Sequence, residues 1–378
     1  MRIVIVGTAY PYRGGLATFN ERLARQFQSE GHEVLVETFT LQYPSFLFPG
    51  KTQYSDAMSP TDLKIEQTFS SVNPISWIKA GNKIASYSPD MVIFAYWMSF
   101  MAPCFGTIAK QVKRKINTKC FGLVHNMLPH EPSLLDKLLP PYFVRSMDGF
   151  IALSKSVLDD IEKIDGCSSP KRYSPHPIYD HYGDLTDKLT AAKNLNLDPS
   201  VNYLLFFGFI RPYKGVDLLL EAFADERLKN INCKVIIAGE FYEDAKRYYD
   251  IEKNLNLSSR IVWCPDFIPD SGVAPYFNIA DIVVLPYKSA TQSGVAQIAY
   301  HFERPLLVTN IAGLPEIVPH GKVGFVVEPD SHAIASAIVD FYTANPPYNF
   351  TEGIKDEKKK YEWVKMTDTI MELYRESK

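Results

Sequence analysis

The chain has 378 residues with a formal net charge of −3, and 46% of its residues are hydrophobic. This length exceeds that of one typical domain, so we expect two globular domains. The small net charge gives no reason to expect a nucleic-acid partner. The five cysteines are scattered without a CxxC pair, which argues against a disulfide framework or a structural zinc site and favours reduced thiols in a cytoplasmic protein. No apolar stretch is long enough to span a bilayer.

A strand, a loop and a helix open the chain. The apolar run Ile3–Val6 is typical of a buried strand and is too short for a signal sequence. After the loop 7–15, apolar residues recur every four positions on one helical face: Phe19, Leu23 and Phe27. A second strand at 34–36 completes a βαβ unit, which implies a parallel sheet with a right-handed crossover.

The same alternation continues through the chain. Further strands of the first half are expected at 91–95, 120–124 and 149–153, and the polar, aromatic stretch from Leu41 to Asn73 is interpreted as one irregular loop. The stretch near 177–200 is interpreted as a linker. A second series of strands follows at 203–207, 233–238, 261–263, 282–285, 305–308 and 324–327. The predicted fold class is therefore α/β, with two doubly wound, Rossmann-like sheets facing each other across a cleft.

The predicted domains follow from this series. Residues 1–180 form an N-terminal Rossmann-like domain, and residues 181–357 form a C-terminal one. The last stretch, 358–378, is predicted to be a helix because Trp363, Met366, Ile370 and Leu373 fall on one face.

Loops at the carboxyl ends of parallel strands commonly bind ligands, and three such loops have suitable chemistry. The first contains Arg13, Gly14 and Gly15, whose paired glycines let backbone amides approach an anion. The alternative is a plain tight turn, and the loop is not the GxGxxG of dinucleotide-binding domains.

The second loop runs from Gly208 to Gly215 and carries Arg211 and Lys214. Forked guanidinium donors and a compact ammonium suit phosphate oxygens, and the strand–loop–helix setting favours phosphate binding over a solvated basic turn.

The third loop, 289–295, combines hydroxyls of Thr291 and Ser293 with the free amides of Ser293, Gly294 and Val295 in the first turn of a helix. This arrangement suits a diphosphate, and the alternative is an ordinary helix capped by Ser293.

One histidine of the N-terminal half follows a strand. His125 comes directly after the strand 121–124, where it could donate or shuttle a proton near neutral pH or be purely structural. The chain has no His/Cys cluster with metal spacing and no Asp-x-Asp pair, so neither a tightly bound metal nor another cofactor is expected.

Together these motifs resemble the family 4 glycosyltransferases of the GT-B fold over nearly the whole chain. The motifs that carry the resemblance are Gly14-Gly15, Gly31–Val34, Gly208–Asp217, Thr291–Gly294, Gly313–Glu316 and Gly321–Phe325. The resemblance implies a retaining, hexosyltransferase-type enzyme that moves a sugar from a nucleotide-sugar donor, with UDP or GDP, to a saccharide or lipid-linked acceptor in polysaccharide or glycan synthesis. It also implies that the C-terminal helix crosses back onto the N-terminal, acceptor-binding domain.

The resemblance implies roles for individual residues. Arg211 and Lys214 would hold the diphosphate, with Gly208 beside them, and the backbone of Ser293, Gly294 and Val295 would cap it. Asp266, Phe267 and Ile268 would lie against the nucleobase. Gly14 and Gly15 would approach the diphosphate, and His125 would face the transferred sugar.

The sequence departs from the family at the third loop. Many members carry two glutamates eight positions apart there, which would align with Thr291 and with Ile298 or Ala299. The nearest polar substitutes are Gln292 and Gln297, and Glu316 is a further candidate for holding donor hydroxyls.

A group of basic and apolar residues bears on where in the cell the protein is found. Lys110, Lys113, Arg114, Lys115 and Lys119 form a basic cluster, and the apolar stretch Leu134–Leu139 is followed by Tyr142 and Phe143. One interpretation is peripheral contact with the inner membrane surface, where lipid-linked acceptors lie; the other is a solvated helix face and an internal core helix.

Two other functions are compatible with parts of this pattern. An NAD-dependent oxidoreductase shares doubly wound sheets, but the missing GxGxxG and the cationic loops of the second half argue against it. A non-catalytic subunit that binds nucleotide or carbohydrate and kept the GT-B fold is the alternative left open by the missing glutamates.

Overall fold

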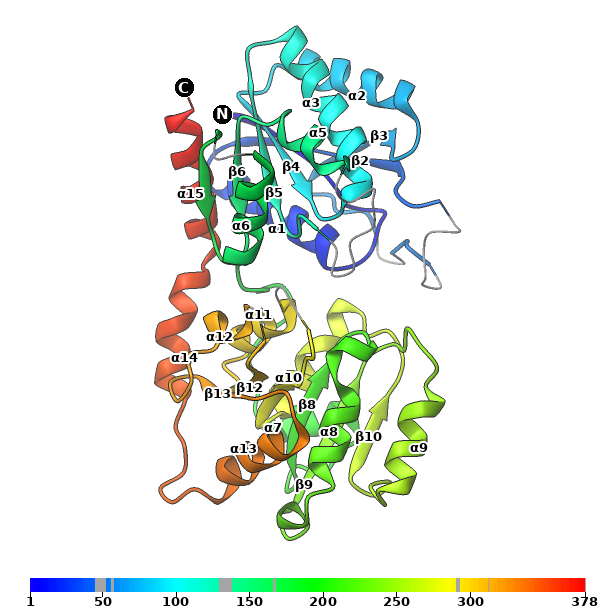
Figure 1. The fold of residues 1–378 in the computed structure, drawn as a ribbon, viewed down its shortest axis with the longest axis vertical. Helices are drawn as coiled ribbons and strands as arrows, with labels where there is room; N and C mark the ends of the chain where they lie inside the picture. Colours follow the sequence, from blue (N-terminus) through cyan, green and yellow to red (C-terminus); the bar gives the residue numbers. More distant parts are fainter. Residues whose placement is uncertain are drawn as a thin grey trace. The chain divides into compact units, whose positions relative to one another are not determined.

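The structure is a computed structural model that describes residues 1–44, 52–55, 58–128, 138–165, 168–289, 293–311 and 313–377. The chain forms two compact units (Figure 1). The N-terminal unit comprises Met1–His176 and Glu362–Lys378, and the C-terminal unit comprises Pro177–Tyr361. The predicted boundaries, after residues 180 and 357, lie within four residues of these.

The N-terminal unit is built on a seven-stranded parallel sheet with the order β3-β2-β1-β4-β5-β6-β7. Its strands are β1 (Arg2–Val6), β2 (Glu33–Leu41), β3 (Lys64–Ser70), β4 (Met91–Tyr96), β5 (Lys119–Val124), β6 (Gly149–Ala152) and β7 (Lys171–Tyr173). The central strands are apolar at nearly every position because helices cover both faces of the sheet.

Two helix layers cover this sheet. One face packs against α1 (Gly15–Ser29) and α15 (Trp363–Glu376). The other face packs against four helices: α2 (Pro74–Tyr87), α3 (Ala102–Lys115), α5 (Pro140–Val144) and α6 (Lys155–Asp165). The predicted apolar face of the last helix is confirmed, since Trp363, Met366, Ile370 and Leu373 are all buried in the core beneath α15.

The interpretation of Leu41–Asn73 as one irregular loop is wrong. Strand β3 lies inside it and pairs in parallel with β2. The sequence of β3, KIEQTFS, buries only Phe69 fully, because this strand is at the edge of the sheet and its other side chains remain partly exposed. An edge strand of this kind lacks the apolar run by which the central strands were recognised.

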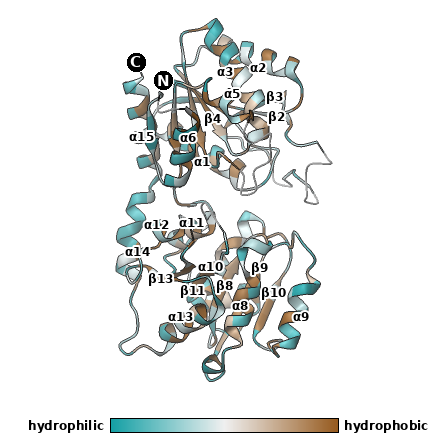
Figure 2. Cartoon of the chain, in the orientation of Figure 1, coloured by the Kyte–Doolittle hydropathy of each residue, from teal (hydrophilic) through white to brown (hydrophobic). Residues whose placement is uncertain are grey.

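The C-terminal unit contains a six-stranded parallel sheet with the order β10-β9-β8-β11-β12-β13. The strands are β8 (Asn202–Phe207), β9 (Cys233–Ala238), β10 (Ile261–Cys264), β11 (Ile282–Leu285), β12 (Leu306–Thr309) and β13 (Gly324–Val327). Figure 2 shows apolar colouring on the inner strands and polar colouring on outward helix surfaces such as α9.

Helices cover this sheet, and one of them corrects the prediction of a linker at 177–200. The helices are α7 (Lys188–Leu195), α8 (Val216–Phe223), α9 (Lys246–Asn254), α10 (Val273–Ile279), α11 (Gly294–His301), α12 (Leu314–Ile317), α13 (Ser331–Thr343) and α14 (Thr351–Lys358). Helix α7 was missed because it is short and polar, but it is capped by the Asp187 side chain and buries Ala191 and Ala192 in the core.

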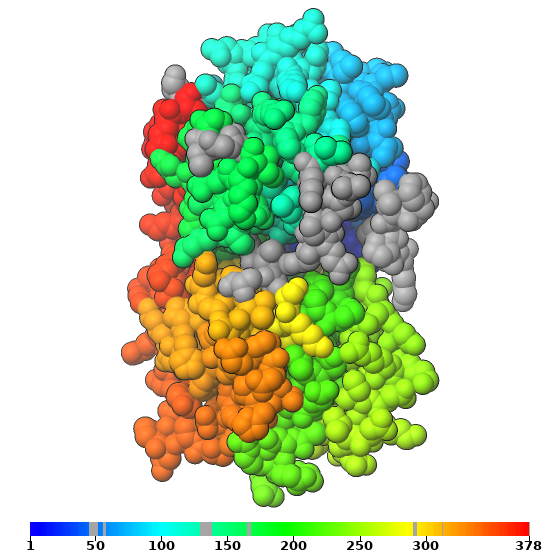
Figure 3. All heavy atoms as spheres, viewed as in Figure 1, coloured from blue at the N-terminus to red at the C-terminus, as the bar shows by residue number. Residues whose placement is uncertain are grey.

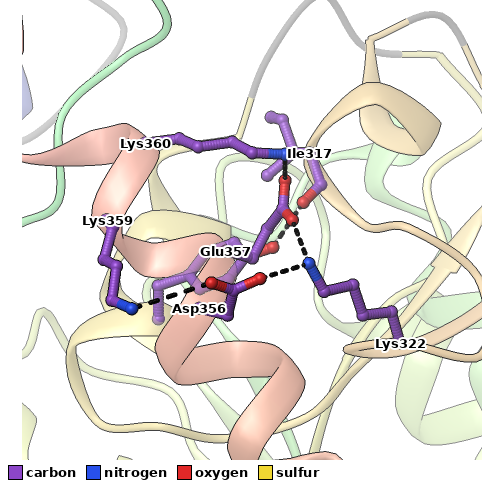
Figure 4. A network of polar contacts seen from close by, with 7 residues as sticks. Ile317, Lys322, Asp356, Glu357, Lys359 and Lys360 are labelled. Atoms are coloured by element: carbon purple, nitrogen blue, oxygen red, sulfur yellow. Dashed lines mark hydrogen bonds and ion pairs between the residues drawn. The ribbon is translucent and has the colours of Figure 1, made fainter.

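Ion pairs tie α14 to the body of the C-terminal unit (Figure 4). The Lys322 ammonium lies 2.7 Å from an Asp356 carboxylate oxygen and 3.1 Å from one of Glu357. Glu357 is almost fully buried and also pairs with Lys360. A buried carboxylate needs such partners, and the two Lys322 contacts join α14 to the segment between α12 and β13.

Each sheet has one point at which the order of the strands reverses. In the C-terminal unit it lies between β8 and β11, and in the N-terminal unit between β1 and β4. Ligands of doubly wound sheets bind in the crevice outside the carboxyl ends of the strands at this point. The loops that follow these four strands are therefore the places to look for a site. Within the described residues, no helix is both long and apolar enough to cross a membrane.

Candidate functional site

The loop after β8 brings Lys214 back over the start of the loop. Gly208, with φ of 99°, lets the chain turn away from the strand, and the 3₁₀ turn Pro212–Lys214 leads into α8. The Lys214 Nζ atom lies 3.2 Å from the position that a Cβ at Gly208 would occupy. A side chain at position 208 would therefore press on the ammonium.

Gly215 joins this loop to its neighbour across the reversal point. Its φ is 70°, and an added Cβ would lie 1.9 Å from the carbonyl oxygen of Pro286, which follows β11. The Lys288 amide also donates to the Tyr213 carbonyl oxygen at 2.7 Å. The loops after β8 and β11 are thus held in direct backbone contact, which only glycine permits at position 215.

The two cations of the loop have different surroundings. Burial, with a smaller contribution from Arg211, lowers the pKa of Lys214 to about 8. The Lys214 ammonium lies 5.6 Å from the Tyr287 ring centroid, and the Arg211 guanidinium lies 4.8 Å from that of Tyr242. Repulsion between the two cations and burial of the Lys214 ammonium both cost free energy. An anionic ligand would reduce both costs, so this loop favours binding of an anion.

The start of α11 lies beside this cation. A Val295 methyl carbon is 3.6 Å from the Cβ position at Gly208, and α11 begins at Gly294. The Ser293 side chain forms no capping hydrogen bond; its hydroxyl lies 3.3 Å from that of Tyr287. The amides of the first helical turn are therefore not capped by Ser293, which argues against the alternative of an ordinary Ser-capped helix.

Asp217 holds the surrounding charges in place. It is buried in the first turn of α8, and one of its carboxylate oxygens accepts hydrogen bonds from Arg247 Nη2 and Lys288 Nζ, both at 2.6 Å. These three residues come from α8, α9 and the segment after β11. One carboxylate offsets only one of these two cations, so this cluster keeps a net charge of about +1 and adds to the positive charge of Arg211 and Lys214.

The other predicted donor residues are spread along the same sheet edge. Asp266, Phe267 and Ile268 follow β10, two strands from β8, and Phe267 is half-exposed. Glu316 lies in α12, which follows β12 on the other side, and it is exposed.

Gln297 lies in the interior instead. Its side chain is fully buried, and neither amide atom has a hydrogen-bond partner in the described part of the chain. Thr291 and Gln292 lie outside the described residues.

In the N-terminal unit, the glycine loop and His125 lie near the reversal point between β1 and β4. Gly14, with φ of 104°, precedes α1, and apart from its chain neighbours no heavy atom of the described residues lies within 4 Å of the Cβ position there. His125 follows β5, and its ring packs edge-on against Phe19 of α1 at 4.7 Å. Burial lowers the pKa of His125 to about 3.

The low pKa of His125 has a chemical consequence. The ring is neutral near pH 7, so it offers one N–H donor and one acceptor instead of an imidazolium proton. Its Nε2 atom is buried, and the described residues supply no partner for it.

Three tyrosines that shape these loops, and the ion pairs made by Asp217, were not predicted from the sequence. Tyr287 lies beside Lys214, Tyr242 lies under Arg211, Tyr179 lies 3.0 Å from the Cβ position at Gly294, and Asp217 anchors Lys288. Lone tyrosines give no signal in a single sequence. Asp217 did give one, because it is an acidic residue in the first helical turn after a Lys-Gly loop.

The described residues contain no group of three or more His, Cys, Asp or Glu side chains that could hold a metal ion.

Comparison with known proteins supports a transferase. Residues 201–344, which contain the β8 and β11 loops, match the family model described as glycosyl transferases group 1. An uncharacterised glycosyltransferase of Methanocaldococcus jannaschii is 23% identical, over 100% of this chain and 98% of its own. The N-acetyl-alpha-D-glucosaminyl L-malate synthase of Bacillus anthracis is also 23% identical, over 87% of this chain and 84% of its own.

Solved structures share the fold. The sucrose-phosphate synthase of Thermosynechococcus elongatus superposes with a TM-score of 0.75 at 14% identity, over 100% of this chain and 99% of its own. Anabaena HepE in complex with UDP and glucose superposes with a TM-score of 0.73 at 15% identity, over 98% of both chains.

Proposed function

From the premise that this chain is a family 4 glycosyltransferase of the GT-B fold, we propose that it transfers a sugar from a nucleotide-sugar donor and binds the donor's diphosphate at the β8 and β11 loops. One observation carries the proposal. The Lys214 ammonium, whose pKa burial lowers to about 8, lies 3.2 Å from the Cβ position at Gly208 and 5.6 Å from the Tyr287 ring centroid, and α11 begins beside it without a capping hydrogen bond from the Ser293 side chain.

The chemistry of transfer explains why this arrangement matters. When the bond between the donor's sugar and its diphosphate breaks, negative charge grows on the departing diphosphate. A fixed ammonium, a guanidinium and helix amides stabilise that charge more strongly than they stabilise the bound donor. Lys214 is the leading candidate for the catalytic cation, and Arg211 supports it.

UDP is the first nucleotide to test, with GDP as the alternative. HepE has been solved with UDP and glucose, and another structural neighbour, at 12% identity, carries UDP-2-fluoro glucose. Asp266, Phe267 and Ile268 are proposed to contact the base, and Gln297, Glu316, Thr291 and Gln292 are proposed candidates for the donor's hydroxyl groups.

We propose retention of anomeric configuration, with the departing phosphate helping to deprotonate the acceptor hydroxyl. A neutral His125 would then act as a hydrogen-bonding group toward the transferred sugar, and Gly14 and Gly15 would leave room for the donor. This role uses the neutral ring that its low pKa dictates.

We also propose that the chain's own cations meet the diphosphate charge without a metal ion or other cofactor. The expected result is that 5 mM EDTA, about a thousandfold above trace metal, leaves turnover unchanged, whereas a donor held through a divalent ion would lose most of its turnover. Product release measured with and without EDTA decides between them.

The acceptor is proposed to be a saccharide or a lipid-linked glycan of cell-surface polysaccharide synthesis, reached by a cytoplasmic protein in peripheral contact with the inner membrane surface. The family match and the full-length relatives do not favour the alternative of a non-catalytic binding subunit.

The decisive experiment screens UDP, GDP and their sugar conjugates by thermal stabilisation and then measures nucleotide release from the best donor. A ligand that binds only the folded protein raises its apparent stability. Stabilisation by a nucleoside diphosphate together with donor turnover is the expected result. Stabilisation without turnover of any donor would favour the binding subunit.

A further inference from the structure

We propose that Asp217 is a positioning residue that holds the side chains of Arg247 and Lys288 back from the bound diphosphate and thereby lets the nucleotide product leave quickly. The inference rests on the proposed function, because it assigns a further role at the same diphosphate site. It adds to that site a residue that weakens product binding, whereas the residues described so far strengthen it.

Asp217 lies close to Lys214 along the chain. It is in the first turn of α8, three residues after Lys214, so the two Cα atoms are at most about 11 Å apart. The Asp217 side chain is only 9% exposed. Its charge therefore acts on a diphosphate at Lys214 with little solvent screening.

One carboxylate oxygen of Asp217 binds both cations. Arg247 Nη2 and Lys288 Nζ each donate to Oδ2 at 2.6 Å, whereas Oδ1 accepts a hydrogen bond from the Leu218 amide at 3.1 Å. Hydrogen bonds between ionised groups are about twice as strong as neutral ones. The Arg247 and Lys288 side chains are nevertheless 48% and 39% exposed, so an anionic ligand could reach either of them.

Backbone contacts already place the segment after β11. The Lys288 amide donates to the Tyr213 carbonyl oxygen at 2.7 Å, and Pro286 lies against Gly215. Figure 3 shows this segment in yellow next to green atoms of the region around β8 and α8. Because these contacts involve no charged side chain, the Asp217 carboxylate has a separate effect: it fixes where the Lys288 side chain points.

Lys288 is near enough to the diphosphate site to change its affinity. The ring of its neighbour Tyr287 lies 5.6 Å from Lys214 Nζ, and the Lys288 amide is bonded to Tyr213, the residue before Lys214. A lysine side chain is flexible over its four carbons. Without the Asp217 carboxylate, the Lys288 ammonium would be free to turn toward an anion at Lys214.

The carboxylate also limits the positive charge around the site. Four cations stand on or beside the β8 and β11 loops: Arg211, Lys214, Arg247 and Lys288. Asp217 offsets one of these charges, and its removal would raise the positive potential at the diphosphate.

An increase in positive potential would affect the product more than the donor. Cleavage frees a terminal phosphate whose second ionisation has a pKa of about 6, so the product carries about one more negative charge than the donor near pH 7. Product release limits kcat in many enzymes. A site with too much positive charge would therefore bind donor well and turn over slowly.

The test is Asp217→Asn, which preserves the shape of the side chain and removes its charge. One charge at roughly 10 Å changes the Kd of a dianion about tenfold at an effective dielectric constant of about 50. We therefore expect calorimetry to show UDP binding about tenfold tighter than in the wild type. Stopped-flow measurement with a fluorescent UDP analogue should show dissociation slowed by a similar factor, with a lower kcat and an undiminished kcat/KM for the donor.

A second substitution separates charge from structure. Lys288→Met alone should weaken UDP binding severalfold and speed its dissociation, and its half-exposed position makes it a test that does not depend on folding of Asp217→Asn. The double variant Asp217→Asn/Lys288→Met has the wild-type net charge, so its UDP affinity and kcat should return to within about threefold of the wild type. If the ion pairs only stabilised the fold, the double variant would be no better than the single ones.

The matched control is Asp356→Asn on α14. Asp356 also accepts a hydrogen bond from a lysine of the C-terminal unit, Lys322, at 2.7 Å (Figure 4). This variant loses the same charge and the same kind of partner, and its UDP affinity should stay within about twofold of the wild type. Thermal unfolding of every variant is recorded alongside.

Unchanged or weaker UDP binding by a folded Asp217→Asn would overturn the inference, as would a double variant that shows no recovery or a Lys288→Met variant that binds UDP as the wild type does. The wild type reports on the proposed function separately. If the wild type bound neither UDP nor GDP and turned over no donor, the proposed function itself would be refuted. Normal wild-type binding and turnover with the wrong sign in Asp217→Asn would refute only the role of Asp217.

Discussion

Replacing Lys214 with alanine should cost this protein most of its turnover without unfolding it. The ammonium is the one cation of the β8 loop that is both desolvated and next to the start of α11. Its pKa of about 8 leaves roughly ten protonated molecules for each neutral one at pH 7, so the wild type carries the charge in use.

The magnitude follows from the hydrogen bonds removed. A hydrogen bond to a charged group contributes about 1.5–3 kcal/mol, and removal of a donor aimed at developing negative charge typically costs about 10²–10³ in kcat. We therefore expect kcat/KM to fall about a hundredfold in Lys214→Ala. Ground-state binding of a nucleoside diphosphate should weaken less, by about tenfold.

The assay is release of nucleoside diphosphate from the donor, with nucleotide binding measured by calorimetry. The matched control is Lys253→Ala, which removes an exposed lysine of α9 in the same unit. A Lys214→Ala enzyme with kcat/KM within about twofold of the wild type would refute the role assigned to this residue.

Three further predictions concern the same loops and the N-terminal unit. Nucleotide affinity of the wild type should be constant below pH 8 and fall as pH rises above it, because the free protein, with a Lys214 pKa of about 8, then loses the proton that the bound diphosphate needs. Calorimetry from pH 6.5 to 9.5 should show a fall of about tenfold per pH unit at most, and an affinity that rises with pH would contradict this. Gly215→Ala should lower the free energy of unfolding by at least about 2 kcal/mol, since it adds a Cβ 1.9 Å from the Pro286 oxygen at a φ of 70°. The control Gly31→Ala has a φ of 84° and no close neighbour at its Cβ position among the described residues, so it should cost only the backbone strain of about 1 kcal/mol. Equal midpoints of urea unfolding for the two variants would contradict the packing argument. His125→Ala should lower kcat about tenfold or more while nucleotide binding stays near the wild-type value, and equal losses in kcat and binding would refute this role. The pH profile of the wild-type rate should show no ionisation of His125 between pH 5 and 8, because its pKa of about 3 keeps the ring neutral.

Much of the fold could be predicted because both sheets are buried on two faces. Strands such as β8 and β11 read as continuous apolar runs, and the apolar stripe of α15 was visible at helical spacing. Two elements were not predicted, the strand β3 and the helix α7. Strand β3 is at the edge of its sheet with most of its side chains partly exposed, and α7 is short and polar, so neither carries a strong periodic signal.

Only some residues of the candidate site could be predicted from the sequence. Charged and glycine-rich positions such as Gly208, Lys214 and Gly294 were predictable because their residue types suggest phosphate chemistry. The tyrosines that set their surroundings were not, because Tyr179, Tyr242 and Tyr287 reach the loops only through tertiary packing. The burial that lowers the pKa values of Lys214 and His125 is also a tertiary effect.

The central claim is that a diphosphate binds where β8 and β11 give way to α8 and α11. A crystal structure of the chain soaked with UDP or GDP tests it most directly. We expect pyrophosphate oxygens within hydrogen-bonding distance of Lys214 Nζ, Arg211 and the amides of Gly294 and Val295. A nucleotide bound at another place, with these groups free of it, would contradict the account.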